Sequence, residues 1–168
     1  MSFAGAVRTC FRKYVTFSGR ASRSEYWYFV LFMFLGTVAL GIVDSVLFGT
    51  TMVETGPGQM AVASNGPIAG LFGLATFLPG LAAGWRRMHD TGRSGLYVFY
   101  PLIVMVGIGT AVAFFGGIGQ FRDGEAGVLA AIVLVPAMIV LAISPLLVLW
   151  WLTRPSEPRE NQWGPPPA

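Results

Sequence analysis

The sequence predicts an all-α integral membrane protein with four transmembrane helices and an N-terminal amphipathic interfacial helix. Of its 168 residues, 54% are hydrophobic and only 11% are charged, whereas about a quarter of the residues in ordinary soluble proteins are charged. Four uncharged runs are each long enough to cross roughly 30 Å of hydrocarbon at about 1.5 Å per helical residue. With their flanking residues, these runs predict membrane helices at about 23–44, 68–85, 96–118 and 127–152.

Basic residues are unevenly distributed around these runs. Ten of the eleven lysines and arginines precede the first run, lie between the second and third, or follow the fourth, and only Arg122 falls on the other side. Because membrane proteins keep lysine and arginine in their cytoplasmic loops, we expect both termini to be cytoplasmic. Topology thus accounts for the net charge of +3, and we expect no nucleic acid as a partner. Residues 1–152 then form a single membrane domain, and 153–168 form a Pro-rich cytoplasmic tail that should be extended.

Residues 3–17 have the pattern of an amphipathic helix that is too polar to span a membrane. At 100° per residue, Phe3 and Cys10 fall on an apolar side, and Arg8 and Arg12 fall on a polar one. We expect this helix to lie in the cytoplasmic interface, with a soluble helix packed on the protein's own loops as the alternative. Cys10 is the only cysteine, which excludes an intrachain disulfide and a cysteine-based zinc site.

The first membrane helix has a start and an end signal. Ser22 and Glu25 have the spacing of a capping box, so we expect the helix to begin near Arg23. Asp44 ends it, and we expect a carboxylate that faces water at the outer interface, with a buried acid that lines a pore as the alternative. Residues 48–67 are rich in Gly, Thr, Ser and Pro and predict an outer loop.

The second membrane helix carries small residues at helical spacing. Gly80 and Gly84 lie four residues apart, a pattern that lets membrane helices approach each other closely. Pro79 is expected to kink the helix. We interpret this pattern as helix packing and not as a pore.

The eleven residues from Trp85 to Gly95, W-R-R-M-H-D-T-G-R-S-G, are the most densely charged stretch between two apolar runs. They hold three arginines, the only histidine and one aspartate. An arginine at the bilayer centre costs roughly 2.5 to 3.5 kcal/mol, so we expect this stretch to be a loop at a membrane surface.

Three stretches together resemble a family of small bacterial inner-membrane proteins catalogued as domain of unknown function 805. They are F-x-G-R-A-S-R-x-E-Y-W at 17–27, R-R-M-H-D-T-G-R-S-G at 86–95 and N-Q-W-G-P at 161–165. The resemblance spans nearly the whole chain and implies an all-helical protein of the bacterial plasma (inner) membrane with cytoplasmic ends. It implies no activity, since the family has no agreed biochemical role. The chain departs from the pattern at Trp163, where relatives often carry Phe or Tyr, and in its longer outer loops.

The charged loop suggests a binding surface. The candidates for binding an anion or a lipid are Arg86, Arg87, His89 and Arg93, because guanidinium groups pair well with phosphate. The expected ligands are the head groups of anionic membrane lipids, and a membrane-protein partner or a second copy of the chain is a further candidate. The competing interpretation is that the arginines are topology signals, saturated by acidic side chains and helix C-terminal carbonyls.

Two other function classes stay open. An enzyme would use His89 as a general base on a phospholipid head group, but His89 and Asp90 point about 100° apart on a helix and form no preset dyad. No second histidine exists to complete a metal site, and we expect neither a cofactor nor catalysis. A small channel or transporter subunit needs ionisable groups along a path, for which Asp44 is the one candidate.

Finally, the two charged cytoplasmic motifs are expected to form a structural charge network of Arg20, Arg23, Glu25 and Asp90. Glu25 and Asp90 are the only acids in these motifs, which hold five arginines. We expect Asp90 to pair with Arg20 or Arg23, and Glu25 to pair with Arg86 or Arg87.

Overall fold

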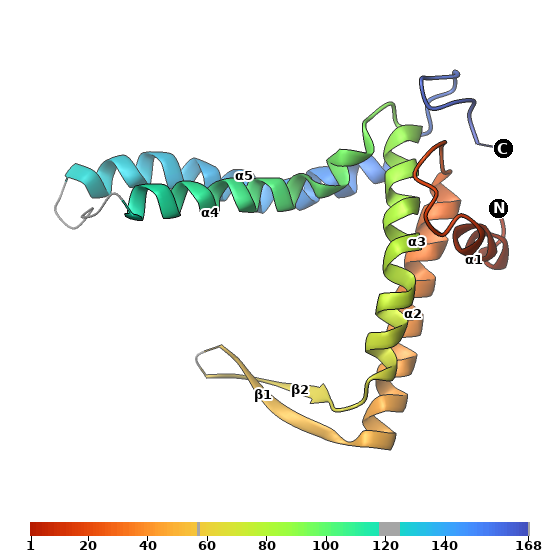
Figure 1. The fold of residues 1–168 in the computed structure, drawn as a ribbon, viewed down its shortest axis with the longest axis horizontal. Coiled ribbons are helices and arrows are strands. Elements are labelled where there is room, and N and C mark those ends of the chain that lie inside the picture. Colours follow the sequence, from red (N-terminus) through yellow and green to blue (C-terminus); the bar gives the residue numbers. More distant parts are fainter. Residues whose placement is uncertain (57, 118–124, 168) are drawn as a thin grey trace.

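The computed structural model describes residues 1–56, 58–117 and 125–167 (Figure 1). In chain order its elements are α1 (Phe3–Arg12), α2 (Arg23–Phe48), β1 (Thr50–Gly56), β2 (Gln59–Ser64), α3 (Ile68–Asp90), the 3-10 helix η1 (Gly95–Phe99), α4 (Tyr100–Gly117) and α5 (Glu125–Thr153). The long helices form two pairs, α2 with α3 and α4 with α5. Figure 1 shows that the pairs meet where α3 ends and leave that point in different directions.

The protein is mostly helical, and three of its described helical segments are long and apolar enough to cross a membrane. They are α2, α3 and the Val135–Thr153 part of α5. The segment from Gly95 to Ala111 is apolar but shorter. The fourth membrane helix and the interfacial position of α1 remain predictions.

Helix α3 extends further than the sequence predicted. It continues to Asp90, so the first residues of the charged motif lie on its last turns and not in a loop. No glycine or proline occurs between Trp85 and Thr91, and Gly92, with a φ of 73°, provides the turn that follows. The next helical segment begins as η1, and α4 starts at Tyr100 with Pro101 in its first turn, where a missing N–H costs little.

The expectation of an all-α chain is wrong between 50 and 64, where the predicted outer loop is an antiparallel β-hairpin. Strand β1 carries threonines and a valine, and β2 alternates Met, Ala and Val, which are compatible with extended backbone. Gly58, with a φ of 72°, lies in the short connection. The Gly, Ser and Thr content of this segment predicted a loop, but the segment forms two strands.

The expectation for Asp44 is also wrong, because this carboxylate neither faces water nor lines a pore. Its side chain is fully buried and caps the start of α3, accepting hydrogen bonds from the N–H groups of Ile68 (3.1 Å) and Ala69 (2.7 Å). Pro67 at the N-cap position has no side chain that can do this. A Cβ added to Gly66 would lie 2.1 Å from Asp44 Oδ1, so the cap requires glycine there.

Small residues bring α2 and α3 together, as the spacing predicts. A Cβ on Gly80 would lie 2.9 Å from Sδ of Met33 on α2. The neighbouring Pro79 has no N–H to donate to the carbonyl of Ala75, four residues earlier. The hydroxyl of Tyr14 donates to that carbonyl at 2.7 Å, so a side chain from outside α3 replaces the lost backbone bond.

Helix α1 packs along the side of α2 and ends at Arg12, before the predicted residue 17. Cys10 is buried in a cluster with Phe29 and Ala83. This burial, with a smaller contribution from Glu25, raises the pKa of the Cys10 thiol to about 12. Phe3 and Phe11 each pack edge-on against an aromatic ring of α2 and remain partly exposed.

Candidate functional site

Arginines and acids of the two charged motifs, residues 17–27 and 86–95, converge at the end of α3. Each carboxylate oxygen of Asp90 pairs with a different arginine, Oδ1 with Arg20 and Oδ2 with Arg87. The Arg20–Asp90 pair joins the segment before α2 to the end of α3, and its closest N–O distance is 2.9 Å. Asp90 is fully buried and Arg20 is 6% exposed, so this carboxylate holds two cations away from solvent.

A second buried pair joins the start of α2 to α3. Arg86 Nη2 lies 2.8 Å from Glu25 Oε1, and Nη1 donates to the carbonyls of Lys13 and Thr16 just after α1. The expected capping box is therefore only half formed. Ser22 Oγ accepts from the Glu25 N–H at 3.2 Å, but the Glu25 carboxylate pairs with Arg86. Among the described side chains, Arg86 Nε is the one buried nitrogen or oxygen atom without a hydrogen-bond partner.

Arg87 ties the end of α3 to the end of α5. Its Nε donates to the carbonyl of Leu152 at 3.0 Å, and Nη2 donates to the carbonyl of Arg154. The C-terminal carbonyls of a helix have no partner within the helix, so a buried guanidinium satisfies them. The Arg87 side chain thus pairs with Asp90 and also donates hydrogen bonds to carbonyls at the end of α5.

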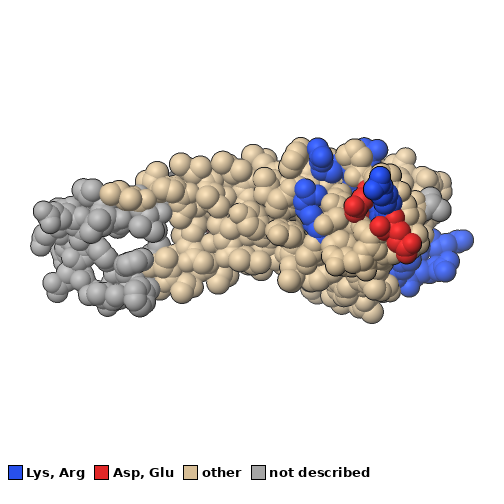
Figure 2. All heavy atoms as spheres, turned by 90° about the horizontal axis from the view of Figure 1, so that it is seen from above, with Lys and Arg blue, Asp and Glu red and all other residues tan. Residues whose placement is uncertain are grey.

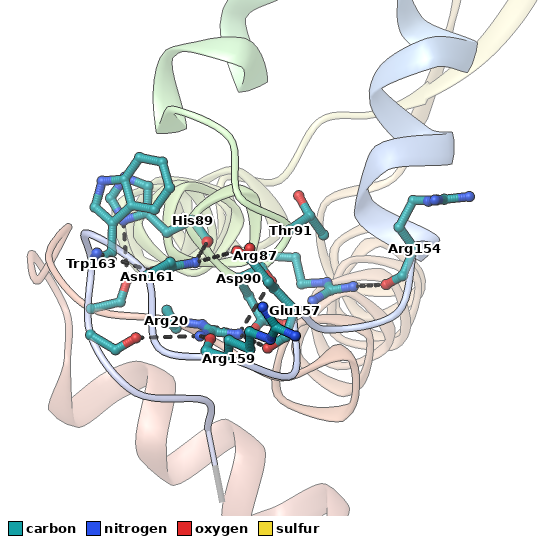
Figure 3. A network of polar contacts seen from close by, with 12 residues as sticks. Arg20, Arg87, His89, Asp90, Thr91, Arg154, Glu157, Arg159, Asn161 and Trp163 are labelled. Carbon is teal, nitrogen blue, oxygen red and sulfur yellow. Dashed lines mark hydrogen bonds and ion pairs between the residues drawn. The ribbon is translucent and has the colours of Figure 1, made fainter.

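The tail covers this cluster, as Figure 3 shows, and is not extended as predicted. Arg20 donates to three tail carbonyls, those of Glu157, Arg159 and Gly164. The Glu157 N–H donates to the Asp90 carbonyl at 2.9 Å. A tight turn closed by Asn161 and Gly164 shapes the segment, with a φ of 116° at Gly164. The tail therefore belongs to the folded structure.

His89 is held between the tail and the segment before α2. Its ring stacks on that of Trp163, with centroids 4.5 Å apart and planes 8° from parallel. Its Nδ1 lies 3.0 Å from the Gly19 carbonyl, and because a carbonyl only accepts, Nδ1 carries the hydrogen. Asn161 donates to the His89 backbone carbonyl at 3.0 Å. His89 is 5% exposed, so its contacts describe a packed side chain.

The remaining cations at this end lie on the surface. Figure 2 shows Lys and Arg side chains gathered over the compact end of the molecule, while the visible described surface of the α4 and α5 arm is uncharged. The guanidinium of Arg93 lies 5.2 Å from a ring centroid of Trp151, and that of Arg154 lies 5.1 Å from one of Trp150. Within the described residues, seven cations form no ion pair: Arg8, Arg12, Lys13, Arg23, Arg93, Arg154 and Arg159.

The structure does not bring the four anion-binding candidates together as one open site. Arg86 and Arg87 are fully buried and committed to carboxylates and carbonyls, and His89 is packed against Trp163. Arg93 alone is partly exposed. Of the four network candidates, Arg20, Glu25 and Asp90 are joined in buried pairs, whereas Arg23 is exposed and makes no ion pair among the described residues.

Sequence reasoning missed the acceptors of this network, which are mostly backbone carbonyls, and the role of the tail. The motif N-Q-W-G contributes to the family resemblance, and its Asn, Trp and Gly are residue types that build turns and stacks. No three described His, Cys, Asp or Glu side chains lie close enough to hold a metal ion together.

Comparisons with known proteins agree with the resemblance. A family model described as "Protein of unknown function (DUF805)" matches residues 14–165. The inner membrane protein YhaH of Escherichia coli strain K12 is 35% identical over 96 residues, which cover 57% of this chain and 71% of YhaH. The inner membrane protein YhaI of the same strain is 35% identical over 118 residues, covering 68% and 87% of the two chains. No solved structure matches, and the names of the relatives indicate no enzymatic activity.

Proposed function

This chain belongs to the DUF805 family of proteins of unknown function, and on that premise we propose that it is a lipid-binding component of the inner membrane. Its ligands are the head groups of anionic phospholipids. They bind to the exposed cations around the charged end of the molecule and not to the buried arginines. Both termini are cytoplasmic in this proposal, since the basic residues mark the inner face.

The unpaired surface cations carry the proposal. Seven described lysines and arginines at the charged end have no ion-pair partner, and Glu157 and Glu160 are the acids outside the buried pairs there. A basic juxtamembrane surface attracts anionic lipid with about 1 kcal/mol per cation near the bilayer. Phosphate oxygens can pair with arginines that no carboxylate already occupies.

The position of α1 supports contact with a bilayer. Phe11 packs edge-on against Phe29 and Phe32, which lie about two turns into α2. Helix α1 therefore lies beside the apolar part of α2 and not above it. Its polar side exposes Arg8 and Arg12, and Phe3 and Phe11 beside the α2 contact remain partly exposed, a mixture of side chains that suits the boundary between acyl chains and head groups.

The buried network has a structural part in this proposal. Arg86 binds the carbonyls that follow α1, Arg87 binds those that end α5, and Arg20 binds those of the tail. These contacts set where the exposed cations of α1, the α5 end and the tail lie relative to one another. The network positions the binding surface but does not itself touch lipid.

The test is a titration of the detergent-solubilised protein with short-chain phosphatidylglycerol, followed by native mass spectrometry, with phosphatidylcholine as the neutral reference. We expect preferential retention of phosphatidylglycerol. Replacing Arg8 and Arg12 with Gln should weaken it by about 2 kcal/mol, or roughly thirtyfold. Arg122→Gln, predicted to lie on the other face of the membrane, is the matched control and should leave binding unchanged.

Equal retention of both lipids by the wild-type protein would overturn the proposal. Loss of binding in the Arg122→Gln control would show that total charge, and not the charged end, attracts the lipid. Normal lipid binding by the Arg8 and Arg12 variant would remove α1 from the binding surface.

A further inference from the structure

The β-hairpin has one face with large apolar side chains. Its register places Met52 opposite Val62, and Glu54 opposite Met60. Opposed residues of an antiparallel ladder project to the same side, so Met52, Met60 and Val62 share a face. These three side chains are 69%, 67% and 64% exposed, respectively. The other face carries smaller residues, with Val53 opposite Ala61.

The hairpin begins at the depth of a membrane surface if α2 crosses the bilayer. About 20 helical residues span the hydrocarbon, and the aromatic residues at the charged end of α2 start at Tyr26. The far boundary then falls near Val46, and β1 begins four residues later, at Thr50. The last residues of α2 are exposed and apolar, with Val46 at 78% and Leu47 at 65%, so a lipid-facing surface continues up to the strand.

The direction of the hairpin keeps it near that depth. Figure 1 shows β1 and β2 leaving the α2–α3 pair sideways and slanting back toward the level of the helices, instead of projecting beyond their ends. A loop that extends into water would point away from the helix pair. The hairpin contacts the rest of the described chain mainly through the end of α2, which leaves both of its faces uncovered by protein.

We propose that the face formed by Met52, Met60 and Val62 lies against lipid in the leaflet opposite the charged end. An isolated two-stranded hairpin is only marginally stable in water, and contact with acyl chains removes its apolar face from water. Its edge N–H and C=O groups keep water partners in the interfacial zone, which the hydrocarbon core does not offer. Glu54, the single charge on this face, lies toward the turn. This surface needs no anionic head group, so it is independent of the proposed lipid-binding function.

The test compares the two faces with an environment-sensitive fluorophore. The full chain, with Cys10→Ala as background, receives one new cysteine, Val62→Cys on the apolar face or Ala63→Cys on the other, labelled with a nitrobenzoxadiazole. The protein is reconstituted into neutral phosphatidylcholine vesicles with and without bromine on the acyl chains. We expect blue-shifted emission at position 62 and quenching by brominated lipid that is several-fold stronger than at position 63.

A second pair on the other strand, Met52→Cys against Val53→Cys, repeats the comparison where a β2 variant fails to fold. Water-like emission at both faces would overturn the proposal. Blue-shifted emission at position 62 without quenching by brominated lipid would also overturn it, because protein would then cover the face. A second copy of the chain would be the covering protein if the unlabelled Val62→Cys variant formed disulfides between hairpins when an oxidant was added.

Discussion

Arg20 and Asp90 lie 70 residues apart in the chain, yet their side chains meet at 2.9 Å in a buried ion pair. The same carboxylate also holds Arg87, so one acid neutralises two cations from different elements. A buried pair of this kind is no guarantee of high stability, because both partners lose their hydration. Replacing only one partner, however, leaves the other charge buried without a counter-charge.

The first prediction concerns that buried charge. Asp90→Asn should lower the free energy of unfolding by about 3 to 5 kcal/mol, since it leaves Arg20 and Arg87 buried without a counter-charge. Unfolding in mixed micelles with increasing denaturing detergent measures the change. Arg23→Gln is the matched control and should leave stability close to unchanged, because Arg23 is exposed and pairs with no described acid. The double variant Arg20→Gln, Asp90→Asn should cost less than the sum of the single changes, and strict additivity would show that the pair is not coupled.

The second prediction concerns the cap on α3. Gly66→Ala should destabilise the protein by about 1 to 3 kcal/mol, because the new methyl group displaces the Asp44 carboxylate from two backbone N–H groups. Gly70→Ala on the same helix is the control, since a Cβ there meets nothing within 4 Å. Thermal melting in detergent compares the two variants. Equal melting temperatures would show that the cap is unimportant.

The third prediction concerns Cys10. A pKa raised from 9.0 to about 12 lowers the thiolate fraction about a thousandfold at pH 8, and burial blocks access as well. Alkylation by iodoacetamide, followed by mass spectrometry, should therefore be very slow in the folded protein and fast in denaturant. Rapid alkylation without denaturant would show that α1 leaves the surface of α2.

The fourth prediction concerns the tail. Trp163→Ala removes the ring stacked on His89, and Asn161→Ala removes a donor to the His89 carbonyl, so both should loosen residues 157–164. Faster hydrogen exchange at the Glu157 N–H, which donates to Asp90, is the readout. Pro166→Ala, at an exposed position after the turn, is the control and should leave exchange unchanged. Unchanged exchange in both variants would mean that the bonds from Arg20 and Glu157 hold the tail without these two side chains.

The fifth prediction is topology. Reporter fusions after Ala168 and within residues 86–95 should report the cytoplasm, and fusions near Gly58 or Gly124 should report the opposite side. The asymmetry of ten basic residues against one motivates this expectation. A fusion after Ala168 that reports the outer side would contradict a topology with four membrane crossings.

The apolar helices could be predicted from sequence because burial in hydrocarbon requires long uncharged runs, a signal that any local window contains. The pairing of Arg20 with Asp90 and of Arg86 with Glu25 was among the alternatives because acids are scarce in the two motifs. Which arginine pairs with each acid depends on the orientation of the helix ends in the folded protein, and a short stretch of sequence does not specify that orientation. Arg23 and Arg20 are three residues apart, and only the latter reaches the interior.

Other features left little signal. Every residue has a carbonyl acceptor. The residue types at Leu152 and Arg154 therefore do not indicate that their carbonyls accept hydrogen bonds from Arg87. The same holds for the tail carbonyls bound by Arg20. The hairpin was hidden by the composition of residues 48–67, which suits a loop as well as two short strands. Asp44 was misjudged because its partners, the first N–H groups of α3, become available only once α3 packs beside α2.

The hydrogen bond from Tyr14 to Ala75 has a consequence for the order of assembly. Its acceptor lies 61 residues further along the chain, and Arg86, which binds the carbonyls of Lys13 and Thr16, lies at least 70 residues beyond them. Helix α1 is therefore synthesised well before the groups that fix its end exist. A substitution that slows the insertion of α3 lengthens the time that α1 spends undocked, even when the finished structure is unchanged.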